Sequence, residues 1–197
     1  MKIYPINNFI KLIVIFLSTL PLLGQCKDIF IGDSLTYELA MSYQKHAPVD
    51  AKYLESTGLN SNKLLDWNSY IKGISLEKYK VVYIVLGTND LIQNNEMLMY
   101  KQKVRNFILT IKMKNDNIVW LLPPALENKK NNILLNNARS SIIDVANIEG
   151  IKLYDMRSVL GYDFKEKNNN IHIRTKDGIH ITKNGANAVI NSMLISN

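Results

Sequence analysis

Two short motifs, one near each end of the chain, contain side chains that can carry out acyl transfer through a serine. The first motif, Gly-Asp-Ser-Leu at residues 32–35, follows a short apolar run. The second motif, Asp-Gly-Ile-His at residues 177–180, precedes an amphipathic run. Ser34 would act as the nucleophile, His180 as the general base, and Asp177 as the carboxylate that orients the imidazole.

The spacing within the second motif suits this chemistry. Asp177 and His180 are close in sequence and precede a predicted helix, so both side chains fit on one turn, and Gly178 eases the bend. The carboxylate then accepts a hydrogen bond from one imidazole nitrogen and leaves the other nitrogen free to take the serine proton. Taken alone, each motif also has a structural explanation, because Asp33 or Ser34 would serve as a helix N-cap and His180 as a structural histidine.

Two further motifs supply hydrogen-bond donors for an oxyanion. Ser-Thr-Gly, which ends at Gly58, follows the second predicted strand and offers a backbone N–H where a side chain would block the approach. Gly-Thr-Asn-Asp follows the most apolar strand, and its Asn89 amide can point at the developing oxyanion. Glycine and asparagine are also ordinary turn formers. The occurrence of suitable groups at three successive strand ends favours the catalytic interpretation, in which Gly32, Asp33 and Asp90 support the reacting groups.

Apolar runs and helical spacing place these motifs in an alternating pattern of strands and helices. Strands are predicted at residues 28–31, 51–55, 81–86, 117–122 and 151–154. Helices are predicted at residues 35–47, 62–71, 97–111, 134–145 and 186–194, and an exposed loop at residues 165–170. This alternation predicts the α/β class, with a parallel sheet covered by helices on both faces. Ligands bind beyond the carboxyl ends of such strands, so the motifs should meet at one edge of the sheet.

Composition excludes several other classes of protein. The chain has 197 residues, of which 47% are hydrophobic, which is enough for one globular domain with a sizeable core. Its single cysteine rules out an intrachain disulfide, and with its three separated histidines no structural zinc site is legible. The net charge is +7, but the lysines are scattered and form no basic stripe, so nucleic acid is not expected as a partner. Two interpretations of this charge remain: a solvated basic surface, or attraction to an acidic polymer or anionic lipid surface.

Residues 1–26 are predicted to be an export segment that precedes a single domain at residues 27–197. Two lysines stand among the first eleven residues, and an apolar stretch follows at residues 12–23. That stretch has the length of a signal-peptide core and is too short for a comfortable membrane span. Three interpretations stay open: lipidation of Cys26, cleavage nearby, and retention as a membrane anchor. Each places the domain outside the cytoplasm, in the periplasm or cell envelope, with membrane association through the N-terminus in two of them.

The motifs resemble those of the GDSL-type SGNH hydrolases over nearly the whole predicted domain. In that family four sequence blocks hold a serine, a glycine, an asparagine and a histidine. Here these positions are matched by Ser34, Gly58, Asn89 and His180, with Asp177 as the remaining triad member. The resemblance implies a flavodoxin-like three-layer α/β/α sandwich with a five-stranded parallel sheet. It also implies metal-independent ester hydrolysis by a Ser-His-Asp triad, without a cofactor.

Export and the catalytic set together lead to a functional hypothesis. The chain is expected to be an exported serine esterase that removes acyl groups, chiefly O-acetyl, from a cell-envelope or extracellular polysaccharide. The same family also includes lysophospholipase-like and thioesterase-like enzymes that act on lipid esters, and O-acyl transfer to a polysaccharide is a third alternative. A non-catalytic carbohydrate-binding relic is the alternative outside enzymology. Its signature would be the loss of a triad residue, and none is lost.

Overall fold

The computed structural model describes residues 27–60 and 63–196. The predicted export segment and Cys26 lie outside these residues, so the predictions of export and lipidation remain predictions. Within the described residues, no helix combines the length and apolar character needed to cross a membrane.

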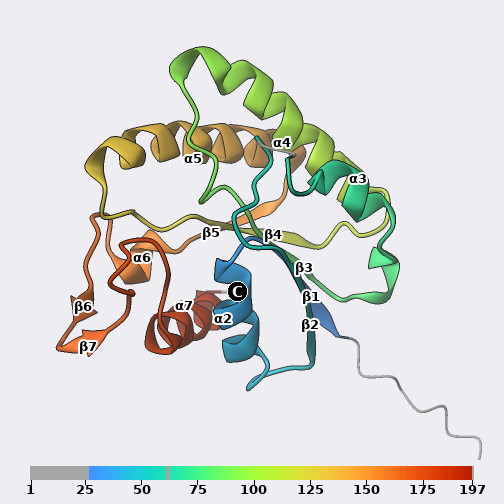
Figure 1. Ribbon diagram of the computed structural model, residues 1–197. Helices are drawn as coiled ribbons and strands as arrows, with labels where there is room; N and C mark the ends of the chain where they lie inside the picture. The colour runs from blue at the N-terminus through green and yellow to red at the C-terminus, as the bar shows by residue number, and fades with distance from the viewer. Residues whose placement is uncertain (1–26, 61–62, 197) are drawn as a thin grey trace, which may run out of the picture.

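A five-stranded sheet, parallel throughout, forms the centre of the protein, with the strand order β2-β1-β3-β4-β5 (Figure 1). Its strands are β1 (Asp28–Gly32), β2 (Val49–Tyr53), β3 (Val82–Val85), β4 (Ile118–Leu122) and β5 (Lys152–Asp155). The predicted α/β class and five-stranded parallel sheet are therefore confirmed. In this order β1 lies between β2 and β3, which brings the carboxyl ends of the first three strands together.

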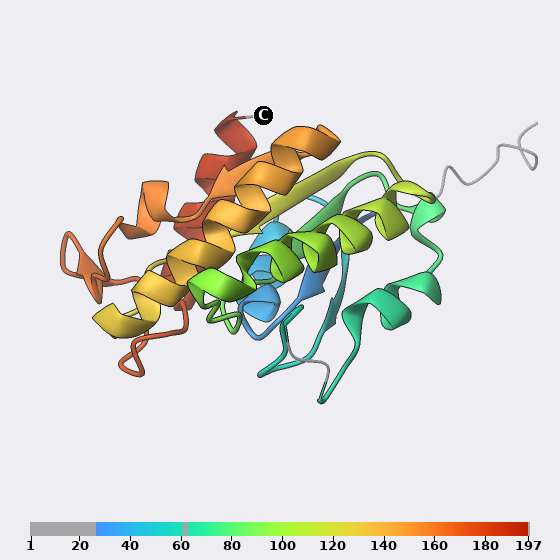
Figure 2. The same ribbon diagram turned by 90° about the horizontal axis from the view of Figure 1, so that it is seen from above.

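Helices cover both faces of the sheet and complete three layers (Figures 1 and 2). One layer consists of α2 (Leu35–Tyr43), the short α6 (Arg157–Leu160) and α7 (Lys183–Ser196). The other consists of α3 (Trp67–Lys72), α4 (Met97–Lys112) and α5 (Lys129–Glu149). Smaller elements are the 3-10 helices η1 (Leu76–Lys78) and η2 (Asn94–Glu96) and the hairpin strands β6 (Lys167–Asn168) and β7 (Ile171–His172).

Alternate side chains of the central strands feed two separate apolar cores. In β1, Ile29 and Ile31 point into the core beneath α4 and α5, whereas Phe30 points into the core beneath α2 and α7. Phe30 stacks there on Tyr83 of β3, with ring centroids 4.5 Å apart. A period of two between faces is the geometry of a strand buried on both sides, and it explains why these runs are continuously apolar.

Element ends differ from the predicted ones where polar caps and turns decide them. The helix predicted at 62–71 begins at Trp67, because the Asp66 carboxylate caps it. The helix predicted at 134–145 is longer, since Asn128 caps its start and Gly150, with φ of 67°, ends it. The first helix ends at Tyr43, earlier than predicted, and the second strand begins two residues early, where Val49 pairs with β1. The loop predicted at 165–170 instead contains β6, although its strand residues are exposed.

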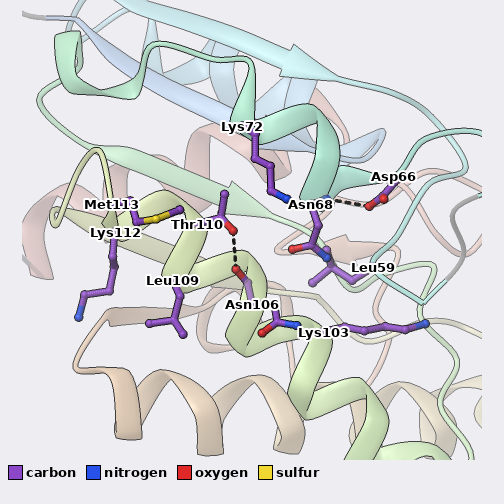
Figure 3. Close-up of a pocket in the computed structure, with 10 residues that line it drawn as sticks. All are labelled: Leu59, Asp66, Asn68, Lys72, Lys103, Asn106, Leu109, Thr110, Lys112 and Met113. Atoms are coloured by element: carbon purple, nitrogen blue, oxygen red, sulfur yellow. Dashed lines mark hydrogen bonds between the residues drawn. The ribbon is translucent and has the colours of Figure 1, made fainter.

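A groove of about 760 Å³ lies between α3 and α4, on the face opposite α2 (Figure 3). Lys72 and Lys103 line it together with asparagines and the apolar side chains of α4. The Lys103 ammonium is held by the backbone and side-chain oxygens of Asn60, each at 3.1 Å. None of the predicted site residues lines this groove.

Candidate active site

Ser34 lies at the tight junction between β1 and α2. β1 ends at Gly32, where a side chain is excluded because a Cβ would come within 1.8 Å of the carbonyl oxygen of Val85. The Asp33 N–H donates to the same carbonyl at 2.9 Å, and the Asp33 carboxylate accepts from the Leu35 N–H at 3.0 Å. These contacts anchor both sides of Ser34 and place it at the N-terminal end of α2.

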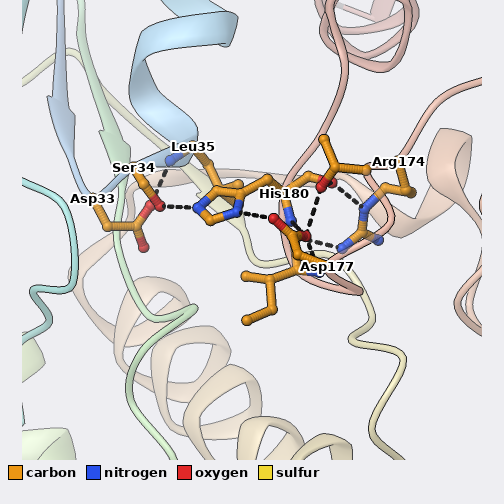
Figure 4. Close-up of polar contacts among 8 residues, drawn as sticks. Asp33, Ser34, Leu35, Arg174, Asp177 and His180 are labelled. Atoms are coloured by element: carbon orange, nitrogen blue, oxygen red, sulfur yellow. Dashed lines mark hydrogen bonds and ion pairs between the residues drawn. The ribbon is translucent and has the colours of Figure 1, made fainter.

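The structure brings the two terminal motifs into contact (Figure 4). The His180 Nε2 atom is 2.9 Å from the Ser34 hydroxyl oxygen, although the two residues are 146 positions apart. The His180 Nδ1 atom is 2.7 Å from the Asp177 carboxylate. All three side chains line one cleft of about 460 Å³. The arrangement is a continuous hydrogen-bonded line from carboxylate to imidazole to hydroxyl, the geometry that a serine nucleophile needs.

The two oxygens of Asp177 have separate tasks. One oxygen accepts from the Thr175 hydroxyl at 2.6 Å and from the N–H groups of Ile179 and His180 at 2.8 and 3.0 Å. The other oxygen accepts from the imidazole. Desolvation raises the pKa of Asp177, but these hydrogen bonds outweigh it and hold the pKa well below its usual range. Asp177 therefore stays ionised and fixed in orientation at neutral pH.

A buried arginine that the sequence analysis did not identify supports this loop. Arg174 is 1% exposed, and its guanidinium donates to the backbone carbonyls of Ala125, Ile179 and His180. It also lies over the ring of Phe164, 4.9 Å from the centroid. Burial lowers the pKa of Arg174 to about 10, so the side chain still carries its charge at neutral pH. The residues next to Arg174 in the sequence do not indicate this role, because its partners are carbonyl groups that only the fold brings together.

The predicted oxyanion donors lie in the loops after β1, β2 and β3. The Asn89 amide donates to the carbonyl of Thr57 at 2.8 Å, which ties the second loop to the third. This bond uses one amide hydrogen of Asn89 and leaves the other available. Within the described residues, no hydrogen bond occupies the backbone N–H of Ser34 or of Gly58. Three N–H donors at this edge of the sheet are thus unengaged.

Asp90 holds the Gly58 loop in place. Its buried carboxylate accepts from the N–H groups of Leu59 at 3.0 Å and Asn60 at 2.8 Å, and from the Tyr100 hydroxyl at 2.8 Å. A Cβ on Gly58 would come within 2.2 Å of this carboxylate, so only glycine fits there. Burial raises the pKa of Asp90, against the lowering effect of these hydrogen bonds. Asp90 was predicted as a supporting residue, whereas Tyr100 was not, because a tyrosine on a predicted helix looks like any other core residue.

Asp33 is the second buried carboxyl group at the site. It is fully buried, and desolvation raises its pKa to about 7 although the Leu35 N–H bond lowers it. The negative charge of Asp90 adds to the increase. Within the described residues, no group of three or more histidine, cysteine, aspartate or glutamate side chains is placed to hold a metal ion.

The sequence matches a protein family over residues 28–195, and that family is described as a protein of unknown function, DUF459. The chain belongs to this family. No protein of curated function matches the sequence significantly. The family match spans all the site residues described above, from Ser34 to His180.

Solved structures of esterases and lipolytic proteins share the fold. A member of the lipolytic protein G-D-S-L family from Veillonella parvula is 14% identical, with a TM-score of 0.65, over 86% of this chain and 96% of that one. The carbohydrate acetylesterase Est24 from Sinorhizobium meliloti is 12% identical, with a TM-score of 0.65, over 86% and 97%. The lipase/acylhydrolase from Enterococcus faecalis is 13% identical, with a TM-score of 0.65, over 86% and 94%. These likenesses confirm the predicted relationship to the GDSL-type SGNH hydrolases at the level of fold.

Proposed function

We propose that this protein is a serine ester hydrolase whose catalytic residues are Ser34, His180 and Asp177. The observation that carries the proposal is the line of contacts from Asp177 through His180 to Ser34, at 2.7 and 2.9 Å. The unengaged N–H donors beside Ser34 support it, because acyl transfer needs stabilisation of an oxyanion as well as a nucleophile.

The proposed reaction has two steps. His180 Nε2 takes the Ser34 proton as the serine oxygen attacks the ester carbonyl, and the carbonyl electron pair moves onto its oxygen. The N–H groups of Ser34 and Gly58 and the amide of Asn89 hold this oxyanion. The intermediate collapses, the alcohol leaves with the proton from His180, and Ser34 keeps the acyl group. Water then attacks the acyl-enzyme by the same route and releases the acid.

Labelling of the full chain with a fluorophosphonate probe tests the nucleophile. We expect wild-type protein to be labelled and Ser34→Ala to be unlabelled, because the probe reacts with an activated serine. Ser75→Ala is the matched control, since Ser75 is exposed and outside the cleft, and it should label like wild type. Folded wild-type protein that takes up no label would contradict the proposal and favour a non-catalytic relic.

The proposed substrate is a short acyl ester, chiefly O-acetyl, on a cell-envelope or extracellular polysaccharide. The cleft beside Ser34 is small, and side chains with hydroxyl or carboxylate groups supply most of its lining. A long acyl chain would need an apolar channel instead. The predicted export segment places such polymers within reach, and one neighbour in fold is named a carbohydrate acetylesterase.

A series of nitrophenyl esters separates this proposal from lipid hydrolysis. We expect the highest kcat/KM on the acetate and a steady fall toward the octanoate, with Ser34→Ala inactive throughout. A preference for the octanoate would instead indicate a lipid acyl hydrolase. If acetate is released and no acetyl group is transferred to added sugars, the acceptor of the acyl group is water and not a carbohydrate hydroxyl.

A further inference from the structure

Two exposed tyrosines flank the nucleophile. Tyr37 lies on α2, one turn beyond Ser34, and Tyr53 is the last residue of β2. The two residues are 46% and 42% exposed, and their ring centroids are 5.8 Å apart at an angle of 48°. Both rings line the cleft that contains Ser34 and His180. Aromatic rings left exposed beside a reactive group forgo the stabilisation of burial, which points to a role in contacting a ligand.

The sheet register explains why Tyr53 is close to the nucleophile. Tyr53 pairs with Gly32, the last residue of β1, so both strands end at the same level. β2 is the edge strand of the sheet that the described residues form. Tyr53 therefore lies on the outermost strand of the described sheet, level with the loop that carries Ser34.

The same cleft contains two carboxylates that have no direct partner. Glu38 and Glu55 line it, and within the described residues neither side chain makes a hydrogen bond or an ion pair. Among the described residues, no lysine or arginine lines this cleft, and Lys45 and Lys183 line the neighbouring hollow, which shares Tyr37 and Glu38 with it. The chain as a whole has a net charge of +7, so this acidic cleft runs against the overall charge.

We propose that Tyr37, Tyr53, Glu38 and Glu55 form a subsite for a neutral sugar ring that bears the ester, and that this subsite excludes uronic acids. The inference rests on the proposed function for the identity of the bond that is cleaved. The apolar face of a pyranose packs on an aromatic ring, and free carboxylates accept hydrogen bonds from its hydroxyl groups. A uronate carboxylate would instead meet the like charges of Glu38 and Glu55 at close range, which is unfavourable.

Binding measurements test the subsite separately from catalysis. The full chain with Ser34→Ala is titrated calorimetrically with acetylated xylotetraose, a neutral probe, and with acetylated tetragalacturonate, an anionic one. We expect at least tenfold tighter binding of the neutral probe. Adding Tyr53→Ala should weaken that binding about tenfold, which is the upper end of what one aromatic contact contributes. Equal affinity for the two probes, or no effect of Tyr53→Ala, would overturn the subsite.

Kinetics on the active protein give a second measurement. The ratio of kcat/KM for acetylated xylotetraose to that for 4-nitrophenyl acetate should fall about tenfold in Tyr37→Ala and Tyr53→Ala. Tyr162→Ala, an exposed tyrosine outside the cleft, should leave the ratio at its wild-type value. The double change Glu38→Gln with Glu55→Gln should raise activity on the acetylated galacturonate, and an unchanged preference would contradict the role of the carboxylates. Failure of the nucleophile labelling with retained sugar binding would refute the hydrolase but keep the subsite.

Discussion

At the scale of single residues, the division of labour between the two oxygens of Asp177 is the most consequential feature. Three donors occupy one oxygen and only the imidazole occupies the other. The carboxylate is therefore unable to turn without losing several hydrogen bonds. This rigidity fixes the tautomer of His180 in which Nδ1 carries the proton and Nε2 accepts one from Ser34.

Replacing Asp177 with asparagine should reverse that tautomer. The asparagine oxygen will occupy the position with three donors, because an NH₂ group is unable to accept from them. The NH₂ group then faces Nδ1 and donates to it, which forces the proton onto Nε2 and leaves Ser34 without a base. We expect kcat on 4-nitrophenyl acetate to fall about 10⁴-fold. Asp163→Asn, an exposed site outside the cleft, is the control, and a loss below tenfold in Asp177→Asn would exclude this role.

Asn89 offers a prediction about the oxyanion. Asn89→Ala removes one donor, and we expect kcat to fall by about 10²–10³ with KM little changed. The variant also loses the bond to the Thr57 carbonyl, so its thermal unfolding is measured alongside. Asn95→Ala, an exposed asparagine on the same connection, controls for surface effects. Wild-type kcat in folded Asn89→Ala would remove this residue from the mechanism.

At the scale of elements, the sequence predicted what local patterns decide. The five predicted strands and their alternation with helices predicted the sheet and its layers, and the parallel topology then required the strand-end motifs to share an edge. The short α6 and the hairpin of β6 and β7 were missed, because four- and two-residue elements have no periodicity to detect. The same limit explains Arg174 and Tyr100, whose partners come from distant loops.

The hydrogen bond from the Tyr100 hydroxyl to the Asp90 carboxylate leads to a prediction about the loop that carries Gly58. Tyr100→Phe keeps the packing but removes one donor from a buried carboxylate, which should lower the free energy of unfolding by about 1–3 kcal/mol. The Gly58 N–H should then be held less firmly, and kcat should fall less than in Asp177→Asn. Urea unfolding and ester hydrolysis measure the two effects. Tyr162→Phe is the control, and unchanged stability in Tyr100→Phe would show that the hydrogen bond from Tyr100 to Asp90 does not stabilise the fold.

At the scale of the whole molecule, the site exists only when the two ends of the domain meet. α2 begins directly after Ser34, and α7 begins shortly after His180. The two helices pack on each other on one face of the sheet, where the Ser42 hydroxyl donates to the Asn187 side chain at 2.8 Å. Assembly of the proposed triad is thus coupled to global folding, so that conditions which unfold the domain also separate the nucleophile from its base.

The buried Asp33 makes that global stability depend on pH. Its pKa is raised from 3.8 to about 7. Between these two pH values the folded state keeps a proton on Asp33 that the unfolded state has released. The stabilisation is therefore complete below about pH 4 and is lost as the pH rises through about 7, at up to about 1.4 kcal/mol per pH unit. The asparagine in Asp33→Asn is neutral at every pH, so this variant should not lose stability in that way as the pH rises.

Urea unfolding of wild type and Asp33→Asn at pH 5 and pH 8 measures the effect. The difference in unfolding free energy should shift in favour of the variant at the higher pH, because only the wild type must bury a carboxylate there. The other buried aspartates, Asp28 and Asp90, are present in both proteins, and because the charge of Asp90 acts on Asp33, the comparison measures the titration of Asp33 together with its interaction with Asp90. Asp116→Asn, an exposed aspartate, should show no such shift. If the unfolding free energies of wild type and Asp33→Asn changed with pH in parallel, the Asp33 carboxyl group would titrate near its ordinary pKa. Burial of this group beside Ser34 would then not disfavour its ionised form.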